Sequence, residues 1–509
     1  MGKIIERKFG KKIYLYEVTS YWDKKNKKSK KNSIYIGKKD LKTGEIIEKK
    51  PKINPKYVTD FGCKYFFEEI INSLKLNNLI NKHFNSISHL IIELVLFQAI
   101  ESKPSYLMEY YYSTKEEINK YSSQRLSEFF YELGKMEINI LDFTKDWIEM
   151  NKIQDSLFYD ITSISSYSNL IDLVGWGYNR DKEKLPQINF GVLYGSSSKL
   201  PLLYKIYPGS INDVKTLKNI HKELKCYKLK NFTFCLDRGF YSVSNLSLIY
   251  DEDFNFIIPI PFTTKIASDF SLKNINKIDN MFHLNGDTIF CEQFETKIGK
   301  NTYFIYIYLN ESRKSKELDK FSREISLIEK KIIKLDLSKT DKNLSKIKKS
   351  IGRFKKYFEI SELENKFFIT KKSSEMDIFV SKMGKILLIS KEKYSEKMEP
   401  IISYVKRDEV EKVFDVLKNE INENRLRVTN SYTVNGRIFI NFLVLICISF
   451  ITKNMQITKF FKKFTINEVL LELKKLKIIY MSDGSKYLCE MTKKQEIIFD
   501  TFKISYPKV

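Results

Sequence analysis

The spacing of apolar residues changes along this chain, and each change predicts a different kind of structure. Residues 12–22 (KIYLYEVTSYW) and 33–37 (SIYIG) are rich in β-formers and flank a Lys-rich segment, which predicts a β-hairpin with a basic tip. Such a tip suits contact with phosphates, but it equally suits a solvated turn. Residues 61–150 place apolar residues three and four positions apart, which predicts a small helical domain.

From about residue 155 short apolar runs replace the helical pattern. They predict three strands, at residues 156–164, 188–195 and 200–209, followed by a helix at 213–225. A strand at 231–237, a helix at 242–252 and a further strand at 255–261 complete the series. The first three strands lie close together in sequence, as in an antiparallel meander. This order of elements predicts a mixed α/β sheet.

Residues 262–395 interrupt that pattern, beginning with more strand-like sequence. Apolar residues from Leu318 to Leu335 then alternate steps of three and four, which predicts a helix packed within its own domain or in a helical hairpin with 340–357. A long helix is expected from about 396 to 424, followed by an apolar helix at 438–451. No chemical role can be assigned to the tail, residues 465–509, from its sequence.

The composition narrows the class of protein without deciding it. The 509 residues are 43% hydrophobic, which excludes disorder as a description of the whole chain. Lys and Arg exceed Asp and Glu by 25 charges, which favours a polyanionic partner, although a Lys-rich coding bias would give the same excess. Six cysteines and four histidines are scattered, so neither a disulfide framework nor a zinc site is predicted.

The apolar runs do not predict a membrane protein. The chain begins without the apolar stretch of a signal peptide, and the run 438–451 is too short to span a bilayer. We therefore expect a cytoplasmic protein in which that run is a buried helix.

Two aspartates stand in apolar strand sequences. Asp160 interrupts the run that begins at Leu157, and Asp237 ends the run that begins at Phe232, directly before Arg238 and Gly239. A carboxylate in such a place is costly unless it is paired or binds a cation. Either aspartate alone could simply cap a turn, but two acids on core strands of one sheet could share a pair of cations.

A third group of polar residues falls in the expected long helix. Tyr404, Arg407, Glu411 and Lys418 are separated by three, four and seven residues, which places all four on one helical face. Glu411 could complete a set of metal ligands, and the other three could contact phosphates. A solvent-exposed helix with internal ion pairs is the alternative.

This Tyr-x2-Arg-x3-Glu-x6-Lys pattern resembles the motif of the YREK-type insertion-sequence transposases. Residues 159–163 (YDITS) resemble the first acidic motif of that family, and residues 236–242 (LDRGFYS) resemble its second. Residues 208–213 (PGSIND) resemble a stretch found between the two. The resemblance covers roughly 155–450.

The resemblance implies a ribonuclease H-like core and the DDE mechanism. Asp160, Asp237 and Glu411 would be the catalytic residues and would hold two Mg²⁺ ions, for which Mn²⁺ could substitute. Tyr404, Arg407, Lys418 and Arg238 would contact DNA. The partners would be terminal inverted repeats and target DNA, held by a homodimer or a higher oligomer on the nucleoid, with no role for a membrane.

The predicted architecture is therefore an α/β core interrupted by an insertion domain. It begins with an N-terminal β-hairpin region (1–50) and a helical DNA-binding domain (51–150). The first part of the core (151–261) and its second part (396–455) are separated by the insertion (262–395), and a tail follows (456–509). The leading hypothesis is cut-and-paste transposition. The alternatives are a ribonuclease H-like nuclease or resolvase without strand transfer, and a transposase-derived DNA-binding protein that has lost catalysis.

Overall fold

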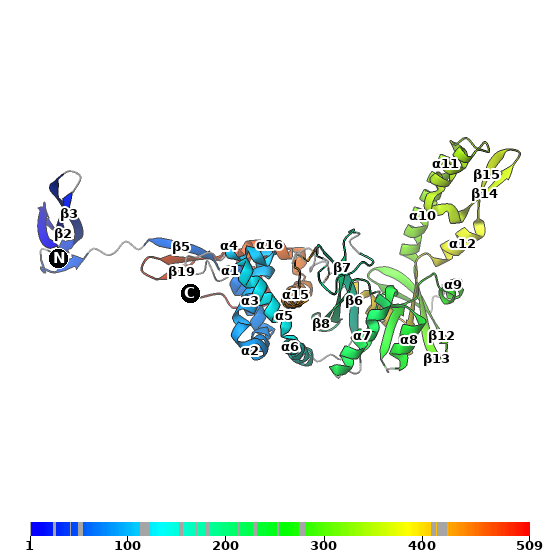
Figure 1. The fold of residues 1–509 in the computed structure, drawn as a ribbon, viewed down its shortest axis with the longest axis horizontal. Coiled ribbons are helices and arrows are strands. Elements are labelled where there is room, and N and C mark those ends of the chain that lie inside the picture. The colour runs from blue at the N-terminus through cyan, green and yellow to red at the C-terminus, as the bar shows by residue number, and fades with distance from the viewer. Residues whose placement is uncertain are drawn as a thin grey trace. The chain divides into compact units, whose positions relative to one another are not determined.

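A computed structural model describes most of the chain. The described residues are 2–23, 27–40, 42–48, 54–111, 122–151, 156–168, 170–179, 183–211, 213–227, 232–251, 254–273, 280–408, 414, 425–426 and 428–508. The chain forms two compact units (Figure 1). The first contains residues 1–63, 471–498 and 505–509, and the second contains residues 64–470 and 499–504.

A four-stranded antiparallel sheet occupies the N-terminal part of the first unit. Its strands, in spatial order, are β1 (Lys3–Phe9), β2 (Lys12–Asp23), β3 (Lys28–Lys39) and β4 (Ile46–Glu48). The turn between β1 and β2 has two residues, and the first, Gly10, has a φ of +58°, which glycine adopts without strain. The pairing of β2 with β3 confirms the predicted hairpin.

The remainder of the first unit joins the N-terminal segment to the C-terminal tail. Strand β5 (Pro55–Asp60) pairs with β18 (Lys477–Met481), which pairs in turn with β19 (Lys486–Leu488). Two helices flank these strands in sequence, α16 (Ile466–Leu473) and α17 (Lys493–Phe502), and each crosses a boundary between the units.

The second unit begins inside the first of the helices predicted for residues 61–150. They are α1 (Gly62–Ser73), α2 (Leu76–Phe84), α3 (Ser88–Glu101), α4 (Met108–Tyr111), α5 (Ser123–Lys135) and α6 (Glu137–Met150). Helices α3 and α5 contact the long helix α15 (Ser431–Ile457). Where α5 crosses α15, a Cβ atom on Gly134 would lie 1.8 Å from the carbonyl oxygen of Tyr432, so this crossing requires glycine.

Two segments are long and apolar enough to cross a membrane by length and composition alone. They are residues Leu76–Glu101 and helix α15. In α15, 83% of the most apolar window is buried inside the protein, which is the behaviour of a core helix. The structure therefore agrees with the prediction of a buried helix at 438–451.

The central feature of the second unit is a mixed sheet that contains the predicted strands. These are β6 (Ser156–Ser166), β7 (Gln187–Gly195), β8 (Pro201–Pro208), β9 (Thr233–Leu236) and β10 (Asn255–Pro259). The order across the sheet is β8-β7-β6-β9-β10, with β6 antiparallel to β7 and parallel to β9. The short strand β17 (Arg425–Leu426) pairs with β6.

Helices cover both faces of this part of the sheet. Apolar residues of α7 (Asp213–Cys226) and α8 (Val243–Asp251) share one core cluster with Leu157, Tyr159 and Ile161 of β6. Because successive residues of a strand face opposite sides, Asp160 points away from that cluster. Helix α15 also packs on the sheet, with the ring of Phe442 lying 4.9 Å from the ring of Tyr204 in β8.

Residues 262–395 contribute four further strands to the same sheet. After α9 (Lys265–Ser271) come β11 (Met281–Leu284), β12 (Asp287–Ile298) and β13 (Asn301–Asn310), and β16 (Lys385–Ser390) follows later in the chain. Strand β16 lies between β13 and β10, antiparallel to both. The range expected to interrupt the core thus also extends its sheet.

Residues 311–384 form a small body with its own core between β13 and β16. It contains α10 (Glu311–Ile333), α11 (Asp341–Ile351), the hairpin of β14 (Phe358–Leu363) and β15 (Lys366–Lys371), and α12 (Ser373–Lys382). Phe321, Ile325, Ile328 and Ile332 of α10 pack in one cluster with Ile347 of α11. The predicted heptad stripe and helical hairpin are therefore both present.

Candidate active site

Two neighbouring strands bring Asp160 and Asp237 together. Strands β6 and β9 run parallel, and Tyr159 is paired with Leu236, so the next residues along the two strands are these aspartates. Paired residues of parallel strands point to the same face, and neighbouring strands lie about 4.8 Å apart. The sheet register therefore places both carboxylates on one face, at the carboxyl end of β9.

The two carboxylates differ in their surroundings. The side chain of Asp160 is 14% exposed, and its Oδ1 atom accepts a hydrogen bond of 2.8 Å from the backbone N–H of Ile161. The side chain of Asp237 is 43% exposed and stands at the start of the turn Arg238–Phe240. Arg238 is exposed beside it. The pair thus combines a nearly buried carboxylate with one that faces solvent.

Arg407 lies against both aspartates. Its Nη1 atom is 3.5 Å from Oδ2 of Asp160, and its Nη2 atom is 3.8 Å from Oδ1 of Asp237. The side chain is 8% exposed, so the guanidinium is nearly withdrawn from water. The planar fork of Arg suits such a two-armed contact with carboxylates. The spacing of the motif predicts that Arg407 contacts phosphate, whereas in the structure its side chain is buried against the acids.

Tyr404 lies beside this cluster, on helix α13 (Glu399–Val405). The guanidinium carbon of Arg407 is 5.6 Å from the centre of its ring. Burial raises the pKa of the Tyr404 phenol, the positive charge of Arg407 opposes that rise, and the negative charge of Asp237 adds to it. The phenol therefore stays protonated at neutral pH and can donate a hydrogen bond.

The long helix predicted from about 396 to 424 is not continuous. Helix α13 ends at Val405, and Lys406 and Arg407 form a turn in which the N–H of Arg407 bonds to the carbonyl oxygen of Tyr404 at 3.0 Å. A hydrogen bond over three residues tightens the chain more than a helical one. The prediction was wrong at this point, because helical spacing in the sequence does not register a turn that inserts Arg407 between two acids.

Two of the predicted site residues, Glu411 and Lys418, lie outside the described residues. Within the described part of the chain, no group of three or more His, Cys, Asp or Glu side chains could hold a metal ion. Asp160 and Asp237 nevertheless supply oxygen donors from adjacent strands, which hard divalent cations prefer. A positive charge, that of Arg407, already lies against both carboxylates. This donor set fits a divalent cation if a third carboxylate joins it.

The glycine of the 208–213 motif has a structural role near these strands. A Cβ atom on Gly209 would lie 1.9 Å from the carbonyl oxygen of Gln187, so the loop after β8 can approach β7 only with glycine there. Asn189 of β7 then donates a hydrogen bond of 2.9 Å to the carbonyl oxygen of Ile211. The motif fixes the chain between the meander and α7; Asn212 lies outside the described residues.

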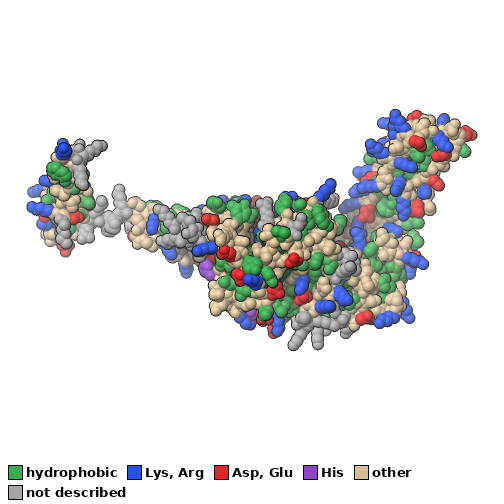
Figure 2. All heavy atoms as spheres, viewed as in Figure 1, with side chains coloured by type: hydrophobic (Ala, Val, Ile, Leu, Met, Phe, Trp, Pro, Cys, Tyr) green, Lys and Arg blue, Asp and Glu red, His purple; other side chains and the backbone are tan. Residues whose placement is uncertain are grey.

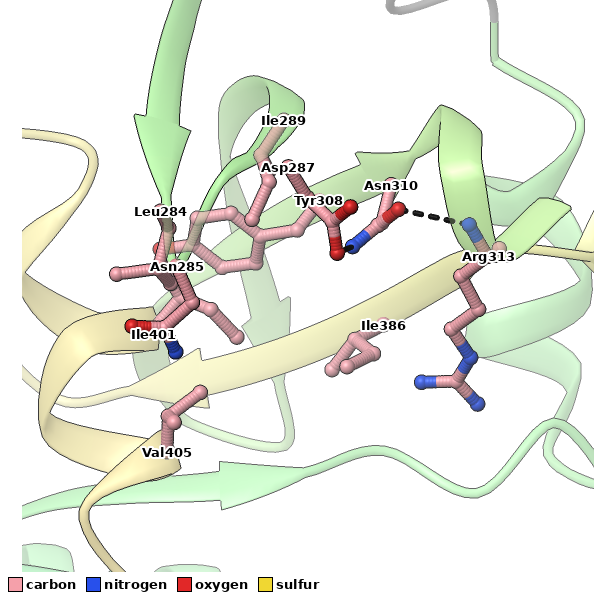
Figure 3. Close-up of a pocket in the computed structure, with 11 residues that line it drawn as sticks. Leu284, Asn285, Asp287, Ile289, Tyr308, Asn310, Arg313, Ile386, Ile401 and Val405 are labelled. Atoms are coloured by element: carbon pink, nitrogen blue, oxygen red, sulfur yellow. Dashed lines mark hydrogen bonds between the residues drawn. The ribbon is translucent and has the colours of Figure 1, made fainter. Parts of the chain in front are cut away.

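A cavity of about 130 Å³ was not predicted from the sequence (Figure 3). Ile401 and Val405 of α13 line it on one side, together with residues of β12, β13 and β16. On its wall Asn310 donates a hydrogen bond of 2.9 Å to Asp287, which helps to lower the pKa of that carboxyl. Because the lining comes from segments more than a hundred residues apart, no local pattern could have indicated it.

The chain is similar to known proteins in its central region. A family model described as a transposase DDE domain matches residues 155–447. No curated protein sequence matches the chain. Among solved structures, a cryo-EM structure of a piggyBac transposase synaptic complex with hairpin DNA is similar at a TM-score of 0.34 and 10% identity, over 77% of this chain and 66% of that one, slightly under two thirds of its length. The family match covers more than half of the chain, which therefore belongs to the transposase DDE domain family.

Proposed function

We propose that this chain is a cut-and-paste transposase that cleaves the ends of an insertion sequence and joins them to target DNA. The proposed catalytic residues are Asp160, Asp237 and Glu411. The observation that carries the proposal is the placement of Asp160 and Asp237 on adjacent parallel strands, with one guanidinium against both. Asp237 directly follows the carboxyl end of β9, the kind of position where ligands bind in α/β folds, and Asp160 lies beside it on β6.

We also propose a ribonuclease H-like core and membership of the YREK-type group. The antiparallel meander β6–β7–β8, continued on its other edge by the parallel strands β9 and β10, supports the core assignment. The proximity of Tyr404 and Arg407 to the aspartates supports the group assignment. Residues 51–150 are proposed as DNA-binding helices, and residues 262–395 as the insertion domain of such enzymes.

Asp160, Asp237 and Glu411 would hold two Mg²⁺ ions, or Mn²⁺ in their place. When bound, such ions activate the attacking hydroxyl and stabilise the leaving oxygen of a phosphodiester. The chain's own groups do the positioning: the sheet register fixes the two aspartates, and the protonated Tyr404 offers a hydrogen-bond donor beside them. Arg407 places one positive charge against the two acids.

DNA contacts are proposed for the remaining motif residues. Arg238 is exposed next to Asp237 and can reach a phosphate held at the acids. Lys418, Tyr404 and Arg407 complete the proposed set. Arg407 belongs to this set from its place beside the two acids. The expected assembly is a homodimer or a higher oligomer on terminal inverted repeats and target DNA, in the cytoplasm on the nucleoid.

A cleavage and joining assay with Asp160→Asn, Asp237→Asn and Glu411→Gln tests this function. On DNA that carries the element ends, each variant should lose cleavage by about a thousandfold or more while binding that DNA within a few-fold of wild type. Asp251→Asn, at the end of α8, is the control and should remain active. Cleavage retained by any of the three would remove that residue from the site. Cleavage without joining to a target plasmid would make the protein a nuclease.

A further inference from the structure

The N-terminal four-stranded sheet concentrates much of the chain's positive charge. Residues 1–50 contain 16 Lys and Arg residues against 6 Asp and Glu residues, which accounts for 10 of the net 25 positive charges. Figure 2 shows Lys and Arg side chains around the strands labelled β2 and β3 in Figure 1. A local excess of this size in a tenth of the chain calls for a physical reason.

The strand register divides this sheet into two unlike faces. Residues of β1, β2 and β3 that pair directly across the sheet share a face, as Arg7, Tyr14 and Lys38 do. We call this the aromatic face, and its basic and aromatic members are Lys3, Arg7, Lys12, Lys31 and Lys38 with Phe9, Tyr14, Tyr16, Trp22 and Tyr35. None of the acidic residues of β1, β2 and β3 belongs to it.

The acidic residues of these three strands all lie on the opposite face. They are Glu6, Glu17 and Asp23. Two of them form salt bridges there, Glu6 with Lys39 at 3.0 Å and Asp23 with Lys30 at 2.5 Å. Among the described residues, the five cations of the aromatic face form no salt bridge. The opposite face thus carries charges of both signs, whereas the aromatic face has one acid near a cation, Asp40 directly after β3, whose pKa Lys38 helps to lower.

Contacts on the aromatic face hold its groups in place. The guanidinium carbon of Arg7 lies 4.8 Å from the centre of the Tyr16 ring, and its Nη2 atom is 3.4 Å from the hydroxyl of Ser33. The ring of Tyr35 lies 5.8 Å from that of Tyr14 and 5.5 Å from that of Tyr16. The face is therefore an ordered platform of rings bordered by cations rather than a set of independent lysines.

We propose that the aromatic face is a binding surface for double-stranded DNA, separate from the DDE site; naming DNA as the ligand rests on the proposed function. Cations on a twisted ribbon match the phosphates that border a groove, and the major groove admits a β-ribbon. Strands β2 and β3 each have 12 residues, a length of about 40 Å, which exceeds one turn of the duplex at about 34 Å. Tyrosine hydroxyls add hydrogen-bond donors for phosphates.

Two matched triple variants of the full-length chain test this surface. One is Lys3→Ala/Lys31→Ala/Lys38→Ala on the aromatic face, and the other is Lys8→Ala/Lys28→Ala/Lys30→Ala on the opposite face. Both remove one positive charge from β1 and two from β3. Affinity for a 30-bp duplex is measured by fluorescence anisotropy between about 50 and 200 mM salt in EDTA, and thermal melting checks that both variants fold.

The aromatic-face variant should bind the duplex about tenfold more weakly. The slope of log K against log salt concentration should become shallower by about two to three, because each lost phosphate contact reduces its magnitude by roughly 0.9. The opposite-face variant should change the slope by less than about one. Equal losses in both variants would reduce the effect to net charge and overturn the proposal, as would unchanged slopes in both.

A second measurement uses Trp22, which belongs to the aromatic face and is 63% exposed. In a Trp176→Phe background the other tryptophan is Trp147, which is fully buried, so a change in emission on adding DNA reports on Trp22. Duplex DNA should quench this emission, and tighter binding and stronger quenching by single strands would contradict a duplex surface. Because EDTA prevents metal-dependent cleavage, these results stand or fall independently of the acid variants above.

Discussion

The Nη1 atom of Arg407 lies 3.5 Å from Oδ2 of Asp160, and both side chains are nearly buried. This contact joins a turn late in the sequence to the first strand of the sheet. It places a fixed positive charge against the acid pair to which the proposed mechanism assigns cations. The contact therefore has consequences for stability and for metal binding that can be measured separately.

Arg407→Ala should destabilise the metal-free protein. The substitution leaves the carboxylate of Asp160, which is 14% exposed, without its nearby positive charge, at a cost of about 1–3 kcal/mol in the free energy of unfolding. Urea denaturation in EDTA measures this cost. The exposed Arg238→Ala is the control and should change stability by less than about 0.5 kcal/mol. Equal stability of Arg407→Ala and wild type would mean that the contact contributes nothing.

The same substitution should strengthen binding of a divalent cation. A guanidinium near the acids repels an incoming cation, so its removal should lower the Kd for Mn²⁺ by up to about tenfold, equivalent to about 1.4 kcal/mol. Free Mn²⁺ can be followed by its electron paramagnetic resonance signal. Asp237→Asn should instead weaken binding. Weaker binding by Arg407→Ala would show that Arg407 holds the acids in position rather than competing with the cation.

The aspartates could be predicted from the sequence, but their relationship to Arg407 could not. Each acid stands in a local apolar run, and such runs predict strands because side chains alternate between faces. Helical spacing likewise placed Tyr404 and Arg407 near each other. The end of α13 at Val405 depends on a contact with strands more than 150 residues away, which local spacing does not contain.

The extension of the sheet shows the same limit. The strand-like sequence of β12 and β13 was evident, but their membership of the core sheet depends on β16, which pairs with β10 across about 130 residues. Strand pairing over such a separation is specified by three-dimensional packing rather than by neighbouring residues. The cavity beside α13 went unpredicted for the same reason.

Gly436→Ala should destabilise the helical part of the second unit. A Cβ atom there would lie 2.1 Å from the carbonyl oxygen of Phe130, so α5 and α15 would have to separate. Replacing glycine by alanine in an ordinary helix stabilises it by up to about 1 kcal/mol, whereas here we expect a loss of about 2 kcal/mol or more. Thermal melting shows directly whether the variant is less or more stable than wild type, and a more stable variant would contradict the close crossing of α5 and α15.

Cysteine reactivity should report the burial of α15. Burial raises the pKa of the Cys447 thiol to about 12, so at pH 8 almost no thiolate is present and the side chain is inaccessible. Cys489 is partly exposed in the tail and should react with iodoacetamide before Cys63, Cys235, Cys291 and Cys447, the buried cysteines among the described side chains. Mass spectrometry of the native and the unfolded protein identifies the modified residues, with Cys489→Ser as the control. Rapid native alkylation of Cys447 would be incompatible with a core helix.

The buried thiol of Cys447 also makes the free energy of unfolding depend on pH. Because its folded pKa is above the ordinary value of 9.0, the unfolded chain loses its proton first as the pH rises. This contribution to stability is present below pH 9 and is lost progressively between pH 9 and about 12. Cys447→Ala should make the fall in stability over that range shallower, as urea denaturation at several pH values would show.

The body formed by residues 311–384 leaves the sheet and returns to it at almost the same point. Strand β13 ends at Asn310, β16 begins at Lys385, and Leu309 pairs with Lys385, while the N–H of Asn310 bonds to the carbonyl oxygen of Gly384 at 2.9 Å. Two antiparallel strands that meet in this way can be joined by a two-residue turn. A shortened chain with Asn-Gly in place of 311–383, which keeps Gly384 opposite Asn310, therefore needs no new backbone path, and its shorter loop costs less entropy to close. The sheet therefore does not need residues 311–383 in order to form, and the length of this segment can vary without disturbing the strands that carry the acids.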